Sequence, residues 1–503
     1  MPNSPSDAVD PLLFDVAVIG AGPAGLAAAV TAADLGQRCV LLDGGPSTGG
    51  QYYRHPAPGL GAARPDRLHH HWSAYTGLAD RLAAHERAGR AAFRGGHQVW
   101  ALERTGDGFA VHVTRGPEST DRATVRARSV LLATGAYERQ LPFPGWTLPG
   151  VVTAGGAQAM LKAGLVLPGR RIVVAGSGPL LLAAASSLVT AGAEVPAVVE
   201  ATAYLGYARR PGVLAGVPGK LVEGAGHGGA LLRHGVRLRP RSAVVEAHGT
   251  DRVTGVTVAR LDADWRPVPG TERRIDCDAL AVGHGLLPQI DLATELGART
   301  RTGPDGAVAL EVDARLRTSV PGLWSAGETN GVGGADLALA EGELAAHAVA
   351  GALPPAALLR RRSRLRAFAE LMAAAHRPGP GWTGWLRPDT DVCRCEEVPV
   401  AAIREAVDEL GAGDPRTVKL LTRAGMGWCQ GRMCGPAVAC LAGPGEPGPD
   451  RRPLGCPVPL AQLAAGPSAG PRAELPPESS AGPAVESSAG PTAESSAGPT
   501  AES

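Results

Sequence analysis

The sequence predicts an α/β protein with two nested Rossmann-like dinucleotide-binding domains, a small helical metal-binding domain and a disordered C-terminal tail. A glycine-rich strand–turn–helix–strand pattern occurs twice, over residues 15–43 and 171–200. Strand-and-turn segments at 130–135 and 318–328 lie on either side of the second copy. Two close pairs of cysteines follow between residues 393 and 434. The order of these features along the chain gives the predicted order of the domains.

Composition restricts the classes of protein that fit. The chain has 503 residues, enough for roughly two to four domains. The formal net charge of +1 is unlike the strongly positive charge that is typical of nucleic-acid-binding proteins. Acidic rather than basic residues precede the first apolar run, unlike a secretory signal, and no apolar stretch approaches the roughly 18 residues of a membrane span. We therefore expect a soluble, cytoplasmic protein with reduced cysteines.

The first glycine-rich pattern begins with a short apolar strand at 15–19. Gly20, Gly22 and Gly25 lead into a helix that ends near residue 35, and a second strand ends at Asp43. Gly20 permits the tight turn, Gly22 lets a pyrophosphate approach the main chain, and Gly25 lets the helix pack on the strand. The helix N-terminus faces the phosphates, and Asp43 is placed to accept from ribose hydroxyls. The combination predicts dinucleotide binding, and a glycine-rich turn without a ligand is the alternative.

The second copy has a strand at 171–175, Gly176 and Gly178 in its turn, and a later strand that ends at Glu200. Leu181 stands where the third glycine of the pattern would be, so we expect the helix to lie farther from the strand. Glu200 would prefer a ribose 2′-hydroxyl to a 2′-phosphate, which favours NAD over NADP. An occupied and an empty nucleotide site both stay open here.

Two further segments indicate that the second domain splits the first. Residues 130–135 form a buried strand that meets a turn at Ala133, Thr134 and Gly135. Residues 318–328 form another strand and turn that end in Gly327 and Glu328, before an alanine-rich helix over 335–350. The predicted domains are 12–145 and 279–352 for the two halves of the first domain, 146–278 for the inserted domain, 353–388 for a connector, 389–443 for the metal-binding domain and 444–503 for the tail.

The cysteines Cys393 and Cys395 form a C-x-C pair, and after 33 residues Cys429 and Cys434 form a C-x4-C pair. Close thiolate pairs that the fold must bring together are typical of a four-coordinate metal or an iron–sulfur site. Glycines crowd the second pair, as expected where main-chain N–H groups approach cluster sulfurs. Spacing alone leaves zinc and iron–sulfur open. Two disulfides or unrelated thiols fit a reducing compartment less well.

The chain resembles the two-dinucleotide-domain flavoproteins of the pyridine nucleotide–disulfide oxidoreductase superfamily. The superfamily more often has Asp where this chain has Glu328. The resemblance implies FAD in the first domain, and NAD or another adenine nucleotide is a candidate for the second. The residues that it assigns to FAD are Gly20, Gly22, Gly25, Asp43, Gly50, Gln51, Ala133, Thr134, Gly135, Gly327 and Glu328. Those that it assigns to the second nucleotide are Gly176, Gly178 and Glu200.

One subfamily resembles the chain more closely, over about residues 12–462. The shared motifs are GGQ at 49–51, GAYERQLPFPGWTLPGV at 135–151, GSGPLLL at 176–182, GGADLAL at 333–339 and RAGMGWCQG at 423–431. They are similar to the α (large) subunits of heteromeric FAD-dependent amino-acid dehydrogenases, a group that includes the B subunit of hydrogen cyanide synthase, the A subunit of opine oxidase and the α subunits of proline–hydroxyproline dehydrogenases. There the C-terminal module is similar to bacterioferritin-associated ferredoxin, which implies a [2Fe–2S] cluster on Cys393, Cys395, Cys429 and Cys434.

This resemblance implies an FAD-dependent oxidoreductase. A separate flavoprotein β subunit would oxidise an amino or imino acid (glycine, proline, hydroxyproline or an opine), and this chain would pass electrons to an acceptor. A small ferredoxin-like subunit is a further candidate partner. Two alternatives stay open: a self-contained NAD(P)H:acceptor oxidoreductase and a zinc-stapled interaction subunit. Disulfide reductase chemistry is excluded, because only Cys39 precedes Cys277 and the flavin motifs lack a dithiol.

No catalytic acid–base set stands out in the sequence, so the catalytic residues stay unknown. His284 is interpreted as a loop residue near the domain junction, with a position facing the flavin as the alternative. Three histidines at 69–71 favour a solvated surface over a metal site, since consecutive side chains diverge. The arginine-rich run at 360–366 predicts a solvated helix face, or alternatively a docking surface for a partner.

The C-terminal segment changes composition after about residue 443. The sequence ESSAGP recurs every eight residues from Glu478 onward. Such a segment buries too little apolar surface to fold, so we predict disorder from about residue 466.

Overall fold

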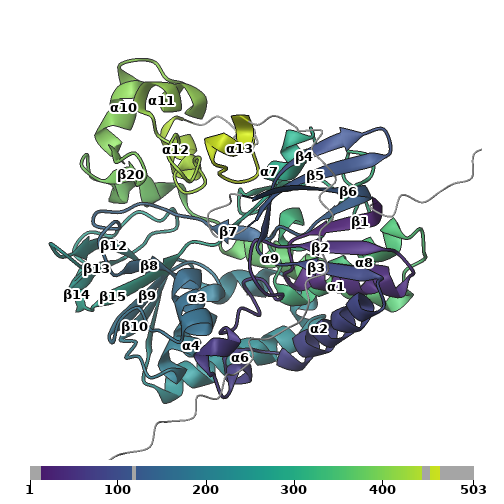
Figure 1. The fold of residues 1–503 in the computed structure, drawn as a ribbon. Coiled ribbons are helices and arrows are strands. Elements are labelled where there is room, and N and C mark those ends of the chain that lie inside the picture. Colours follow the sequence, from purple (N-terminus) through teal and green to yellow (C-terminus); the bar gives the residue numbers. More distant parts are fainter. Residues whose placement is uncertain (1–12, 116–120, 444–451, 453, 465–503) are drawn as a thin grey trace, which may run out of the picture. The chain divides into compact units, whose positions relative to one another are not determined.

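Two mainly parallel sheets organise the computed structural model, which describes residues 13–115, 121–443, 452 and 454–464 (Figure 1). The predicted disorder of the tail lies outside these residues. The strands of the first sheet, in spatial order, are β3 (Ala91–Arg94), β2 (Cys39–Leu42), β1 (Leu13–Ile19), β6 (Asp121–Leu132), β5 (Gly108–Arg115) and β4 (His97–Thr105). Strand β19 (Leu323–Ser325) pairs in parallel with the end of β6. The chain therefore leaves this sheet after β6 and returns to it at β19.

Strand β1 is buried on both faces, as its continuous apolar sequence predicts. Val16 and Val18 pack with the helices, and the alternate residues Ala17 and Ile19 pack with the β4–β5 hairpin. The helices of this domain are α1 (Pro23–Asp34), α2 (Trp72–Arg87) and α8 (Ala335–Val349). A side chain at Gly342 of α8 would overlap the carbonyl oxygen of Ala24, so the small residues of these helices permit their close approach.

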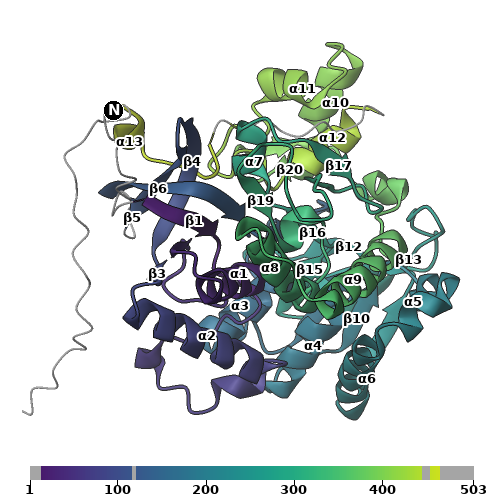
Figure 2. The same cartoon turned by 90° about the vertical axis from the view of Figure 1, so that its right-hand side faces the viewer.

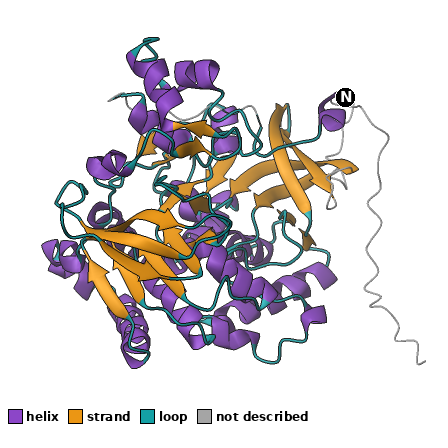
Figure 3. Cartoon of the chain, turned by 90° about the vertical axis from the view of Figure 1, so that its left-hand side faces the viewer, coloured by secondary structure: helices purple, strands orange, loops and turns teal. Residues whose placement is uncertain are grey.

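The second sheet is parallel throughout. Its strands, in spatial order, are β11 (Arg237–Pro240), β10 (Ala197–Glu200), β9 (Ile172–Gly176), β15 (Ala279–Gly283) and β8 (Val151–Thr153). Its helices are α3 (Ala154–Gly164), α4 (Leu180–Thr190), α5 (Pro211–Ala215) and α6 (Pro218–Arg233). A separate antiparallel sheet contains β12 (Ser242–His248), β13 (Gly255–Arg260) and β14 (Arg273–Asp276). Figure 3 shows the strands of these sheets apart from the helical C-terminal region.

Strand β15 requires a correction to the predicted boundary at residue 278. The prediction assigned residues 279–283 to the returning half of the first domain. In the structure Leu280 pairs with Val173 of β9 and with Val151 of β8, so β15 is a central strand of the second sheet. A buried apolar strand has no sequence feature that says which of two parallel sheets it joins. The other boundaries stay predictions.

Two short strands connect the domains. Strands β7 (Ala136–Glu138) and β16 (Leu286–Pro288) pair antiparallel, one leading out of the first domain and one leading back. The elements that follow are α7 (Asp291–Glu295), β17 (Thr300–Thr302), β18 (Val308–Leu310) and α9 (Ala356–Ala375). Figure 2 shows α9 beside α8.

The arginine-rich run lies in α9 and is only partly solvated. Arg366 donates to the buried carboxylate of Glu341 at 2.7 Å, and Arg362 donates to it at 3.2 Å. The predicted solvated face is therefore wrong for these two arginines, because both contact Glu341, a buried residue of α8.

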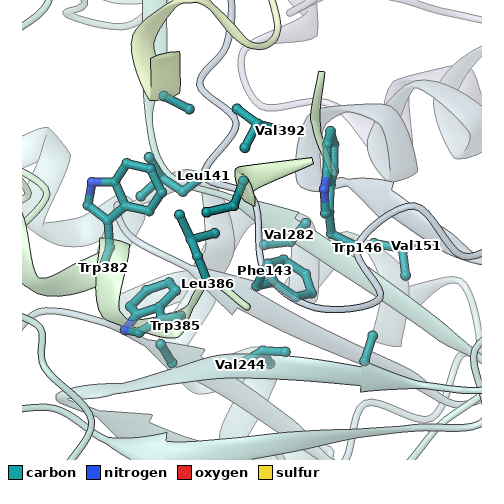
Figure 4. Close-up of a cluster of buried hydrophobic side chains, with 14 of the residues drawn as sticks. Leu141, Phe143, Trp146, Val151, Val244, Val282, Trp382, Trp385, Leu386 and Val392 are labelled. Carbon is teal, nitrogen blue, oxygen red and sulfur yellow. The ribbon is translucent and has the colours of Figure 1, made fainter. Parts of the chain in front are cut away.

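The cysteine-rich region consists of β20 (Asp391–Cys393), β21 (Val398–Pro399), α10 (Val400–Asp408), α11 (Pro415–Thr422) and α12 (Gly435–Leu441), with α13 (Leu460–Ala464) after it. It shares one buried core with the inserted domain and with the segments on either side, which supply Leu141, Phe143, Trp146 and Trp385 to the same cluster as Val392 (Figure 4). The Trp146 indole also donates to the carbonyl of Asp391 at 2.7 Å. The region is thus fixed to the segment that leaves the first domain.

No helix in the described part of the chain is long and apolar enough to cross a membrane. The cytoplasmic location stays a prediction.

Candidate functional site

The first glycine-rich turn joins β1 to α1, and its glycines serve two purposes. Gly20 has a φ of +100°, and a side chain there would overlap the carbonyl oxygen of Ala133. A Cβ at Gly25 would overlap the carbonyl oxygen of Gly20. By contrast, a Cβ at Gly22 would have Gly50 Cα as its nearest neighbour, at 4.0 Å. Gly20 and Gly25 therefore satisfy internal packing, whereas Gly22 keeps open space in front of the turn, as a pyrophosphate requires.

Asp43 lies at the end of β2, beside this turn. Its carboxylate accepts from the main-chain N–H of Ala21 at 2.5 Å and from that of Gly45 at 2.7 Å. A carboxylate has about four acceptor positions, so each oxygen keeps one for a ribose hydroxyl.

The Gly49 and Gly50 loop covers the other side of the turn. The N–H of Gly49 donates to the carbonyl of Ala21 at 2.8 Å. Gly50 has a φ of +58°, and a Cβ there would lie 2.7 Å from Gly22 Cα. Gln51 follows directly and is exposed. The structure therefore places Gly50 against the glycine-rich turn, and the role of Gln51 at FAD stays a prediction.

The two junction motifs, at residues 133–135 and 327–328, lie near the same turn. Ala133 donates from its N–H to Ile19 at 2.8 Å, and the Thr134 hydroxyl donates to the carbonyl of Gln289 at 2.6 Å. Gly135 has a φ of +76° with open space at its Cβ position. Gly327 lies against Ala24 at the start of α1, where a Cβ would come within 2.9 Å of the alanine methyl. Every segment predicted to hold FAD thus borders the turn at residues 20–25.

Glu328 accepts hydrogen bonds from the main chain of the turn that precedes α8. Its carboxylate accepts from the main-chain N–H groups of Gly333 and Gly334, both at 2.9 Å, just before α8 begins. Burial raises the pKa of this carboxyl, and the two N–H groups offset only part of that effect. The longer side chain of Glu compared with Asp lets it reach back to cap this turn. The contact to FAD predicted for Glu328 stays a prediction.

The glycines of the second glycine-rich turn have different surroundings. Gly176 packs so tightly that a Cβ would overlap the carbonyl oxygen of Gly283, and Leu181 is fully buried in the core beneath α4. Gly178 has open space at its Cβ position. The second domain keeps the dinucleotide-binding fold. The acidic residue at the end of its strand β10, Glu200, is buried.

Glu200 is completely buried at the end of β10. Its carboxylate accepts from the N–H of Gly178 at 3.1 Å, from the Thr202 hydroxyl at 2.9 Å and from the Tyr204 hydroxyl at 3.3 Å. His376 Nδ1 lies 3.6 Å away. Burial by itself would raise the pKa of Glu200, but the histidine and these donors outweigh it and lower the pKa. The acceptor positions predicted for a ribose are thus occupied by donors of the protein itself.

Replacing Glu200 with Ala should lower the free energy of unfolding by about 3 kcal/mol, because it leaves buried donors without an acceptor. The contribution of Glu200 is complete above the ordinary carboxyl pKa and is lost as the pH falls, because its folded pKa is lowered. Denaturant unfolding at several pH values measures both. Asp276→Ala, at a side chain 79% exposed, should change stability by less than about 0.5 kcal/mol. Unchanged stability of Glu200→Ala together with weaker NADH binding would show that Glu200 contacts a ribose instead.

The four predicted ligand cysteines come together as two pairs. Cys393 lies next to Cys434, whose thiol lowers the pKa of Cys393 to about 5, and Cys395 lies next to Cys429. The N–H of Gly425 also donates to Cys393 Sγ at 3.4 Å. Among the described residues, no three His, Cys, Asp or Glu side chains are arranged around a single metal ion. Two thiol pairs fit a [2Fe–2S] cluster, in which each iron takes two thiolates, better than one tetrahedral zinc ion.

A buried ion network ties the cysteine loop to the flavin junction. Arg432, between Cys429 and Cys434, donates to Asp291 at 3.0 Å, and Arg452 donates to the other Asp291 oxygen at 2.6 Å. Two residues earlier, the N–H of Gln289 donates to the carbonyl of Gly135 at 2.9 Å, and its own carbonyl accepts from Thr134. The segment 289–291 therefore contacts both candidate cofactor sites. Sequence reasoning missed Asp291 and Arg432, since neither lies in a recognisable motif.

Three other polar side chains are partly or fully buried, and one of them, His284, lies in a loop near the domain junction, as predicted, between β15 and β16. Lys162 of α3 donates to the carbonyl of Tyr52, next to Gln51, at 3.2 Å, and burial lowers its pKa to about 8. His69 stacks on Trp72 with ring centres 4.7 Å apart, so the predicted solvated surface is wrong for this histidine. His284 is buried beside Trp265 and Trp385, and burial lowers its pKa to about 4.

Comparison with known proteins agrees with this architecture. The chain belongs to the pyridine nucleotide-disulphide oxidoreductase family, whose profile matches residues 14–352, and residues 392–441 match the BFD-like [2Fe-2S] binding domain. The protein is therefore an FAD-dependent oxidoreductase of a family that binds FAD and NAD(P), with a [2Fe–2S] cluster in its C-terminal domain.

Several named proteins are similar over most of their length. The HcnB subunit of hydrogen cyanide synthase from Pseudomonas aeruginosa is 36% identical, and the match covers 83% of this chain and 90% of that protein. The A subunit of opine oxidase from Rhizobium meliloti is 34% identical, with 86% and 92% covered. The crystal structure of L-proline dehydrogenase from P. horikoshii matches with a TM-score of 0.58 at 21% identity, covering 86% of this chain and 73% of that one, and so shows a shared fold. The two sequence relatives are named as subunits of larger enzymes.

Proposed function

We propose that this chain is the redox subunit of a heteromeric amino-acid or imino-acid dehydrogenase. It would accept electrons from a substrate-oxidising flavoprotein β subunit and pass them to a downstream acceptor. The observation that carries the proposal is the 289–291 segment, which contacts the flavin junction through Gly135 and the cysteine loop through Arg432. Two redox sites joined by one short segment suit electron transfer within a single chain.

The two thiols nearest the nucleotide-binding motifs in sequence, Cys39 and Cys277, support electron transfer over dithiol chemistry. Cys39 is buried in β2, and burial raises its pKa to about 12. Cys277 is likewise buried, with a pKa raised to about 11. Because the thiolate is the reactive form, neither thiol is a nucleophile at neutral pH.

The roles of the protein's own residues follow from their positions. FAD and the cluster would supply the electron-transfer chemistry, while the protein supplies position and electrostatics. The turn at residues 20–25 and Asp43 would hold the FAD phosphates and ribose. Cys393, Cys395, Cys429 and Cys434 would hold the cluster. Asp291 would fix the cysteine loop against the junction through its two arginine partners.

The test compares the isolated chain with the complex purified through a tag from its native cells. Glycine, proline, hydroxyproline and opines are each added anaerobically, and flavin bleaching and the paramagnetic signal of the reduced cluster are recorded. We expect one substrate class to reduce both cofactors in the complex and none to reduce them in the isolated chain. Rapid bleaching of the isolated chain by NADH alone would instead identify a self-contained NAD(P)H:acceptor oxidoreductase.

A further inference from the structure

His376, which follows the last residue of α9, lies between the second glycine-rich turn and the end of β10. Its ring atom Nδ1 is 3.0 Å from the Thr202 hydroxyl and 3.3 Å from the hydroxyl of Ser177, the middle residue of the turn at 176–178. Its other ring nitrogen, Nε2, is 2.9 Å from the Tyr207 hydroxyl. The histidine is 8% exposed. Three side chains from two segments of the inserted domain therefore hold one buried imidazole.

This imidazole lies where a dinucleotide would place its adenosine ribose. In the Rossmann fold the pyrophosphate lies at the glycine-rich turn, and a ribose hydroxyl reaches the acid at the end of the second strand. Here Ser177 belongs to the turn, and Thr202 comes two residues after the strand-end acid, Glu200. A side chain within hydrogen-bond distance of both hydroxyls lies between the two places that a bound dinucleotide would contact.

The acceptor positions of Glu200 are also taken by donors of the protein. One carboxylate oxygen accepts from the N–H and from the hydroxyl of Thr202, at 3.1 and 2.9 Å. The other accepts from the N–H of Gly178 at 3.1 Å and from the Tyr204 hydroxyl at 3.3 Å. A carboxylate has about four such positions, so a ribose hydroxyl could bind Glu200 only by displacing one of these donors.

Helix α9 fixes the position of His376. Arg366 and Arg362 of this helix donate to the buried carboxylate of Glu341 in α8, at 2.7 and 3.2 Å. Because both charges lie against a buried partner, moving α9 would break a buried ion pair, which is costly. His376 is thus attached to a helix that is itself anchored to the first domain.

The segment that follows β10 packs directly on the end of this helix. Tyr207 stacks on Phe368 of α9 with ring centres 6.2 Å apart and planes inclined by 17°. A Cβ at Gly206 would lie 3.0 Å from the Cβ of Ala375, the last residue of α9. For a nucleotide to enter beside β10, this segment and α9 would have to separate.

We propose that His376 excludes NAD(H) and NADP(H) from the second domain by occupying the adenosine ribose position. The proposal goes beyond the proposed function and does not rest on it, because it concerns nucleotide binding by the isolated chain. The exclusion acts at the ribose end of the site, since in the described part of the chain a Cβ at Gly178 would meet no atom within 4 Å. His376 is therefore a specificity-determining residue in a domain that keeps the dinucleotide-binding fold.

The test measures the binding of ADP-ribose to the FAD-loaded full chain by calorimetry. This probe carries the adenosine ribose and the pyrophosphate but no nicotinamide, so it binds without redox chemistry. We expect the wild type to bind with a Kd weaker than about 1 mM. His376→Gly should bind at least about tenfold more tightly, because it empties the ribose position, and free imidazole should compete for the same space. His376→Phe keeps a ring in that space and should bind as weakly as the wild type.

The matched control is His234→Gly. His234 likewise follows the last residue of a helix, α6 of the inserted domain, but it is exposed. Its removal empties no buried space, so this variant should bind ADP-ribose as weakly as the wild type.

Three results would overturn the proposal: submillimolar binding of ADP-ribose by the wild type, no tighter binding by a folded His376→Gly, or an equal gain in His376→Phe. The wild-type measurement needs no variant, so it can overturn the proposal even if His376→Gly does not fold. Substrate-dependent reduction of the native complex is a separate measurement. If it persists while the wild type binds ADP-ribose, the proposed function stands and only the role of His376 is wrongly assigned.

Discussion

Replacing Cys395 with Ser should remove the cluster while FAD stays bound. Serine offers a hydroxyl that does not ionise at neutral pH, so the cluster would lose one of its four thiolate ligands. Cys395 is the informative position because it is exposed, whereas Cys393 and Cys434 belong to the buried core. Loss of the cluster in Cys395→Ser therefore reports ligation rather than packing. Acid-labile sulfide, iron content and absorbance beyond the flavin bands measure the cluster, and released flavin measures FAD.

The matched control is Cys440→Ser. Cys440 is an exposed thiol on α12 in the same region and belongs to neither thiol pair. This variant should keep iron, sulfide and FAD at wild-type levels. If Cys395→Ser kept its iron and colour, the ligand assignment would be wrong. A colourless wild type containing zinc would favour the zinc-stapled alternative.

Local sequence constraints explain which parts of the fold could be predicted. Gly20 and Gly25 are recognisable by their spacing in the turn between β1 and α1. A larger side chain would overlap the carbonyl oxygen of Ala133 at the first position and that of Gly20 at the second. The apolar run at residues 16–19 of β1 reflects two cores on opposite faces of one sheet. These features are visible in the sequence as a fixed spacing of glycines and as a run of apolar residues.

The environments of single polar side chains could not be predicted in the same way. Glu200 lies at the end of the strand where it is expected, but its buried carboxylate lies 3.6 Å from Nδ1 of His376, a residue far along the chain. The sequence around Arg362 and Arg366 predicts a solvated helix face, but both side chains contact the buried Glu341 of α8. Asp291 and Arg432 meet only because the cysteine region packs beside α7. Such contacts join distant segments, and nothing in either segment alone identifies its partner.

Replacing Gly22 with Ala should weaken FAD binding without lowering the stability of the FAD-free protein. Gly22 has a φ of −68°, which alanine adopts readily, and a Cβ there would meet nothing closer than Gly50 Cα at 4.0 Å. The added methyl group would instead occupy the space in front of the turn, where a pyrophosphate must approach the main chain. We expect FAD affinity to fall at least tenfold, or by about 1.4 kcal/mol, with the melting temperature of the FAD-free protein unchanged.

Two further glycines separate cofactor binding from folding. Gly25→Ala should lower both FAD content and stability, because its methyl group would overlap the Gly20 carbonyl. Gly77→Ala, in the open middle of α2, should leave FAD unchanged and add up to about 1 kcal/mol of stability. FAD retained at full affinity by Gly22→Ala would mean that the pyrophosphate does not approach this turn. Since Gly50 faces Gly22 across the same space, that result would also remove Gly50 from the site and leave the first domain without its phosphate contacts.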